Sequence, residues 1–130
     1  MIISLDFQGS PNIGVYGLTA GDYALLPPVV QEKVVERIRD TLGVRVICTY
    51  IATSTLIGAL CVGNSHGLLV PRTIREEELN ELKRNGIDVY VLEGTKKTAL
   101  GTLILANDRG AIVGRRLYRE AKKALADALG

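Results

Sequence analysis

The chain contains one segment three times, and this repetition limits its possible folds more than any other feature. The copies are IGVYGLTAGDYALLPP at 13–28, IGALCVGNSHGLLVPR at 57–72 and LGTLILANDRGAIVGR at 100–115. Repetition at a fixed period is typical of proteins in which one supersecondary unit packs against copies of itself. The sequence therefore predicts three equivalent units.

The boundaries of these units follow from the alignment. The copies are offset by 44 and then 43 residues, so that Gly14, Gly58 and Gly101 coincide. We expect one domain over residues 1–130. Its three repeats are expected to span residues 1–43, 44–86 and 87–130.

Each unit is expected to contain three strands followed by a helix. β-Branched and aromatic residues predict a first strand at 2–7, 44–51 and 87–93. A second strand is expected to begin at the shared Ile-Gly or Leu-Gly pair. A polar turn and a short apolar third strand follow.

Apolar residues at helical spacing predict the closing helices. They recur through 29–42 and 73–85, and in the last unit they include Leu117, Ala121 and Leu125. The T-x-x-E pattern of Thr73 and Glu76 predicts a capping box at the start of the second helix. The sequence thus indicates an α/β protein of three β-β-β-α units, with the helices on the outside.

Two arrangements of the units remain open at this point. The units could close into a ring with pseudo-threefold symmetry, which would be a monomer, although propellers usually have four or more blades. The alternative is an open arc, whose exposed apolar flanks would favour a homodimer. We expect the closed ring, because the repeat boundaries coincide with the ends of the chain.

The polar turn GNSHG at 63–67 holds the only histidine, His66, and follows one of two cysteines, Cys61. A cysteine nucleophile needs a base within hydrogen-bond reach. In the repeat alignment His66 replaces Asp22 and Arg109, in a turn, and Cys61 is expected inside a strand. We therefore expect no catalysis, and the sequence indicates no metal or cofactor site.

Charge is distributed unevenly along the chain. The net charge is −2 over 1–43, +1 over 44–86 and +3 over 87–130. The basic last third could face an acidic partner such as RNA, or it could be a solvated helix face. Only Tyr118 supplies an aromatic ring within this cluster.

The segments IGVY…LLPP, CVGNSHGLLVP and ALGTLILANDRGAIV, with the start MIISLDFQGSPNIGVY, resemble the translation initiation factor 6 family of archaea and eukaryotes. The resemblance covers nearly the whole chain. It implies the pentein fold, an α/β propeller that has five units in the family, so that two are missing here. The expected fold is a pentein-like propeller shortened to three repeats.

The resemblance also implies a function. Family members bind the large ribosomal subunit, at ribosomal protein and rRNA near the sarcin–ricin loop, and block its association with the small subunit. They are cytoplasmic, are not membrane-bound and are not enzymes. The alternative is a truncated or engineered three-repeat scaffold without ribosome function.

Within the matched motifs we select candidate ribosome-binding residues from the polar turns and the position just beyond. These are Asn64, His66, Arg72, Asn107 and Asp108. Asn and Asp also favour turns for local reasons, since they hydrogen-bond nearby backbone. Equivalent turns should lie at one end of the units and so act as one surface.

Overall fold

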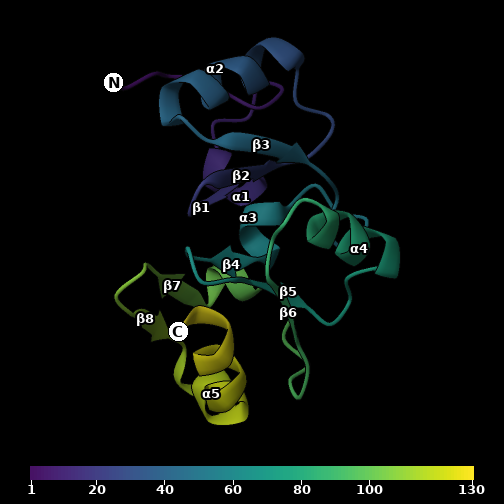
Figure 1. The fold of residues 1–130 in the computed structure, drawn as a ribbon, viewed down its shortest axis with the longest axis vertical. Helices are drawn as coiled ribbons and strands as arrows, with labels where there is room; N and C mark the ends of the chain where they lie inside the picture. Colours follow the sequence, from purple (N-terminus) through teal and green to yellow (C-terminus); the bar gives the residue numbers. More distant parts are fainter.

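The computed structural model describes residues 1–130 as a mixed α/β protein with small sheets. The three units follow one another along the longest axis, from the N-terminal unit at one end to the C-terminal helix at the other (Figure 1). The strands are β1 (Leu18–Ala20), β2 (Tyr23–Leu26), β3 (Arg45–Cys48), β4 (Val62–Gly63), β5 (Leu68–Pro71), β6 (Val89–Leu92), β7 (Ile104–Ala106) and β8 (Ala111–Val113). The helices are α1 (Ile13–Tyr16), α2 (Glu32–Leu42), α3 (Ile57–Leu60), α4 (Glu76–Arg84), α5 (Arg115–Leu129) and the 3₁₀ helix η1 (Leu100–Thr102).

Each complete sheet crosses a repeat boundary. β1 and β2 form an antiparallel hairpin, and β3 of the next repeat adds to β2 in parallel, with Leu25 opposite Ile47. The second sheet repeats this order, with β4, β5 and β6, and with Leu69 opposite Tyr90. The third sheet contains only β7 and β8. A parallel pair needs a crossover connection, which α2 and α4 supply.

The strand expected at 2–7 is wrong. Only one isolated bridge, between Phe7 and Ser10, forms in this segment, and Met1 and Ile2 are 95% and 97% exposed. Its counterparts in the other units, β3 and β6, are strands because β2 and β5 supply their hydrogen-bond partners. No such strand lies beside residues 2–6, so the same local preference does not produce a strand.

The shared Ile-Gly or Leu-Gly pair begins a short helix and not the second strand. α1, α3 and η1 start there, and the second strands begin four or five residues later. At Gly58 and Gly101, the backbones of successive units approach each other closely. A Cβ atom on Gly58 would lie 2.0 Å from the carbonyl oxygen of Gly14, and one on Gly101 would lie 1.9 Å from that of Gly58.

The three long helices are confirmed, but α2 and α4 start three residues later than expected. The predicted capping box of Thr73 and Glu76 is wrong, because α4 begins at Glu76 itself. Arg75 is the N-cap residue, and its N–H donates to the Glu78 carboxylate at 2.8 Å.

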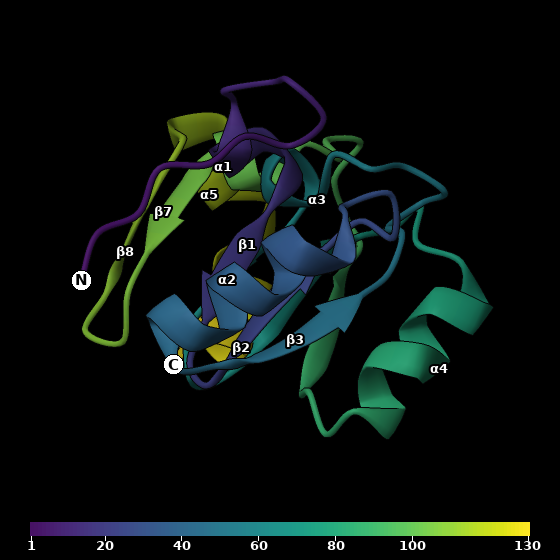
Figure 2. The ribbon, with the colours of Figure 1, turned by 90° about the horizontal axis from the view of Figure 1, so that it is seen from above.

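α4 and α5 pack in core clusters that join neighbouring sheets, whereas α2 packs on the first sheet alone. Residues of β2 alternate, so that Tyr23 and Leu25 join the core cluster of α4, whereas Ala24 and Leu26 join that of α2. In the next sheet Leu69 joins the cluster of α5. Burying one leucine contributes about 1.5–3 kcal/mol, so these layers hold the units together. Seen from above, α4 projects on one side and the β7–β8 hairpin lies on the other (Figure 2).

The closed ring with pseudo-threefold symmetry is not confirmed. Ile112 is 73% exposed, although its equivalents Leu25 and Leu69 are fully buried between units. At the other end of the arc, no atom outside its chain neighbours lies within 4 Å of a Cβ position on Gly14. The first and third units therefore do not repeat the contact that joins successive units. The three units therefore do not close into a ring. Closed propellers usually have four or more blades.

Candidate functional site

The three polar turns form a row at one end of the strands, which we call the polar-turn face (residues 19–22, 63–67 and 106–110). Equivalent residues contact each other along it. A Cβ atom on Gly21 would lie 3.3 Å from Cα of Ser65, and the N–H of Ser65 donates to Oδ1 of Asp108 at 2.8 Å. The repeat thus builds one continuous surface from three separate segments.

Asn64 is the structural centre of this face. Its Nδ2 donates to the carbonyl oxygens of Asn107 (3.1 Å) and Leu129 (2.7 Å). Its Oδ1 accepts from the N–H groups of His66 (2.9 Å) and Gly67 (3.3 Å). The residue is 4% exposed, and its side-chain amide donates two hydrogen bonds and accepts two, all within the chain. Asn64 therefore supports the face and does not present itself on it.

Asn107 and Asp108 lie exposed in the third turn. Oδ1 of Asn107 accepts from the N–H groups of Arg109 (2.8 Å) and Gly110 (3.1 Å), which is the local role expected of Asn in a turn. Hydrogen bonding from Ser65 lowers the pKa of the Asp108 carboxyl, and His66 acts in the same direction. Asp108 therefore presents a carboxylate on the surface at neutral pH.

The charge of the face changes along the row. Asp22, His66 and Arg109 occupy one equivalent position in successive turns, and all three are exposed. Asp22 is paired with Arg45, whose Nε lies 3.7 Å from Oδ2. The residue at this one position thus changes from acidic in the first turn to basic in the third, where Asp108 lies beside Arg109.

Arg72 is not part of this group. It follows β5 at the end opposite the second polar turn, since β5 leads away from that turn from Leu68 to Pro71. Of the five candidate residues, the structure therefore brings together Asn64, His66, Asn107 and Asp108, and leaves Arg72 at the other end of the strands.

The cysteines do not form a nucleophilic site. Cys61 is 1% exposed and lies in a core cluster, directly after α3 and not inside a strand as expected. Burial raises the pKa of its thiol, and Glu78 raises it further. His66 is exposed. A buried neutral thiol and an exposed imidazole do not make an activated pair.

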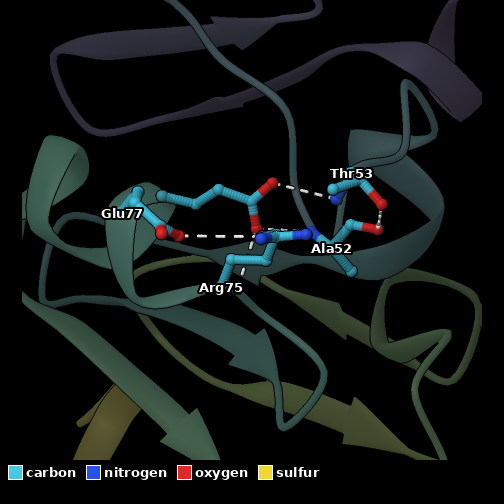
Figure 3. A network of polar contacts seen from close by, with 5 residues as sticks. Ala52, Thr53, Arg75 and Glu77 are labelled. Carbon is cyan, nitrogen blue, oxygen red and sulfur yellow. Dashed lines mark hydrogen bonds and ion pairs between the residues drawn. The ribbon is translucent and has the colours of Figure 1, made fainter.

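A second polar network lies beside α4 and was missed by the sequence analysis. Ala52 and Thr53 both have positive φ angles, 52° and 57°, in the turn after β3. Oε1 of Glu78 accepts from the N–H of Ala52 at 2.8 Å, and Oε2 accepts from that of Thr53 at 2.9 Å (Figure 3). Positive φ is unusual for a β-branched residue, so this carboxylate stabilises a strained turn. Nothing in the local sequence of residues 52–53 indicated this contact.

No group of three or more His, Cys, Asp or Glu side chains is placed to hold a metal ion. None of the helices has both the length and the apolar character needed to cross a bilayer.

Comparison with known proteins gives the family. The model of the eIF-6 family matches residues 2–130. The chain belongs to the eIF-6 family. The match includes all three repeats and the whole polar-turn face, and it confirms the resemblance seen in the repeated motifs.

Curated relatives of this eIF-6 chain carry the name translation initiation factor 6. That of Staphylothermus marinus is 39% identical over 133 residues, and that of Pyrococcus furiosus is 41% identical over 134 residues. The protein of Methanocaldococcus jannaschii is 40% identical over 134 residues. The alignments cover 99% of this chain but only 58% or 59% of each relative. The chain therefore spans less than two thirds of the length of these translation initiation factors.

Proposed function

We propose that this protein binds the large ribosomal subunit and prevents its association with the small subunit. The expected partners are ribosomal protein and rRNA near the sarcin–ricin loop, in the cytoplasm. The observation that supports this proposal is the polar-turn face, where three turns in an eIF-6 chain form one exposed row. Loops positioned by a rigid scaffold commonly carry binding residues.

His66, Asn107 and Asp108 would make the contacts, and Asn64 would hold the second and third turns in register. Asn64 joins these turns directly through the carbonyl of Asn107. Arg109 extends the same row and is exposed. Arg72 would contribute only if the partner also reached the opposite end of the strands.

Cosedimentation with purified large subunits tests binding, and light scattering of mixed subunits tests anti-association. We expect the intact chain to pellet with large subunits and the double change His66→Glu and Arg109→Glu to remain in the supernatant. Arg37→Glu on α2 is the matched control, because Arg37 is exposed outside the polar-turn face. If the intact chain stays in the supernatant at low salt, or if both variants lose binding equally, the proposed function is wrong.

The alternative function is a three-repeat scaffold without ribosome binding. This alternative holds if ribosome binding needs a complete ring, which the structure does not show. If the chain binds large subunits but does not block their association with small subunits, binding and anti-association are separate activities.

We also propose that the three repeats form one pentein-like domain, arranged as a segment of a propeller. The equivalent contacts of Gly58 on Gly14 and of Gly101 on Gly58 support this arrangement. The exposed Leu105 and Ile112 mark the end where a further layer would pack. Ile112→Asp should leave the unfolding temperature within a few degrees and reduce self-association in sedimentation equilibrium. A large loss of stability would contradict an open end.

A further inference from the structure

A strip of positive charge runs along the outer surface of α5, and neither the fold nor the polar-turn face accounts for it. Arg115, Arg119 and Lys122 follow one another at intervals of four and three residues, and Arg116 and Lys123 lie beside them. All five side chains are exposed. We call these five residues the α5 basic face.

The strip is continuous although α5 is kinked at Ala121, where φ is −140°. Nζ of Lys122 lies 5.5 Å from the centre of the Tyr118 ring, so the side chains before and after the kink share one side. The opposite side of the helix is buried throughout, with Leu117, Ala121 and Leu125 in one core cluster. The helix therefore presents its cations together and away from the core.

These cations are not neutralised within the chain. None of the five takes part in an ion pair or a side-chain hydrogen bond. Glu120, which lies on the same helix, is already engaged with Lys97 at 3.8 Å and with the hydroxyl of Thr95. The other long helices differ, since α2 carries three basic and three acidic residues and α4 carries four acidic and two basic residues.

The position of the first two arginines is unfavourable for the helix itself. Arg115 and Arg116 occupy the first turn of α5, where the helix dipole favours acidic residues. α2 and α4 follow the usual preference, with Glu32 and with Glu76, Glu77 and Glu78 in their first turns. Helix stability therefore does not explain the basic start of α5.

We propose that the α5 basic face binds the phosphodiester backbone of RNA. Three of its five cations are arginines, whose planar donor groups suit phosphate oxygens. The exposed ring of Tyr118, which is 45% accessible, offers a surface on which a base can stack. A protein partner would require an apolar centre in the interface, and Tyr118 is the only large exposed apolar side chain on this helix.

The proposal concerns a surface other than the polar-turn face and does not depend on anti-association. The strip occupies residues 115–123, whereas α5 reaches the second polar turn only at its other end, through the Leu129 carbonyl. Binding to naked RNA can therefore be measured without ribosomes.

The test is fluorescence anisotropy of a labelled single-stranded RNA, titrated with the intact chain at several salt concentrations. The triple variant Arg115→Gln, Arg119→Gln and Lys122→Gln removes three cations from the strip. The matched control removes three exposed cations from α2, as Lys33→Gln, Arg37→Gln and Arg39→Gln. Thermal unfolding of both variants is measured to check that each is folded.

We expect the α5 variant to bind at least tenfold more weakly at low salt. The slope of log affinity against log salt should fall in magnitude by about 2, because each phosphate contact on a single strand contributes about 0.7. The α2 variant should keep both values. The proposal is overturned if the intact chain does not bind RNA, or if the two variants lose affinity equally. It is also overturned if polyglutamate at equal charge competes as well as unlabelled RNA, since that result assigns the face to an acidic protein.

Discussion

The backbone of Gly101 lies against the backbone of Gly58 so closely that a Cβ atom on Gly101 would be 1.9 Å from the Gly58 carbonyl oxygen. Gly58 meets Gly14 in the same way, at 2.0 Å. Successive units thus join through backbone contacts that exclude any side chain, and these contacts require the glycines at positions 58 and 101.

Gly58→Ala should destabilise the protein by more than about 3 kcal/mol, because the Cβ atom cannot fit without moving α3 away from α1. Gly14→Ala is the matched control. It introduces the same methyl group in the equivalent helix, where no atom outside the chain neighbours lies within 4 Å. The control should be neutral or gain up to about 1 kcal/mol from helix propensity. Chemical denaturation measures both, and equal losses would contradict the assigned contact.

Asn64→Asp should cost about 2–4 kcal/mol, because it replaces a buried donor with an oxygen that faces two carbonyl oxygens. Asn107→Asp makes the same chemical change in the equivalent turn. Oδ1 of Asn107 accepts two hydrogen bonds and the residue is exposed, so that variant should lose less than about 1 kcal/mol. Urea denaturation at neutral pH compares the two, and a larger loss for Asn107→Asp would show that the roles are reversed.

Glu78→Gln should cost about 1–3 kcal/mol. The carboxylate accepts three backbone hydrogen bonds, and it holds Ala52 and Thr53 at positive φ. An amide offers only one acceptor atom, so at least one of these donors loses its partner.

The adjacent Glu77→Gln is the control for the loss of one charge in the same helix turn. Glu77 makes only an exposed ion pair with Arg75 at 3.6 Å, and such pairs contribute about 0–1 kcal/mol. Hydrogen exchange at residues 52 and 53 should rise in Glu78→Gln alone. Unchanged protection there would argue against the carboxylate as the support of the turn.

Tyr23→Phe should preserve or increase stability. The Tyr23 hydroxyl is buried without a hydrogen-bond partner, and removing such a group relieves an uncompensated desolvation cost. Burial, with Cys61 and Asp22, raises the pKa of Tyr23 to about 12 from its usual 10.

The folded state binds the hydroxyl proton of Tyr23 more tightly than the unfolded state does. The stability that this proton contributes is therefore fully present below pH 10. Stability should fall between about pH 10 and 12, by up to about 3 kcal/mol. Melting curves from pH 8 upward should show a shallower alkaline decline for Tyr23→Phe. Parallel curves for both proteins would mean that folding does not raise the pKa of Tyr23.

The repeats, the three long helices and the family could be predicted from the amino-acid sequence. The helices follow from apolar spacing within one unit, and the repeats and the family follow from motifs that recur along the chain. The apolar stripe of Leu117, Ala121 and Leu125 is a local pattern, and it predicted the buried side of α5 correctly. The equivalence of residues 64 and 107 likewise placed two polar turns at one end of the strands.

The tertiary structure alone decided what each repeated residue does, because strand pairing and burial depend on the neighbouring unit. Residues 2–6 align with the segment of β3 in the repeat but lack a partner strand, and Ile112 is exposed where Leu69 is buried. Asn64 is enclosed by α5 and the third turn, whereas the equivalent Asn107 is exposed. Equivalent sequence thus gives equivalent local structure only where the neighbouring unit supplies the same contacts, and the neighbours decide which copy becomes core and which remains surface.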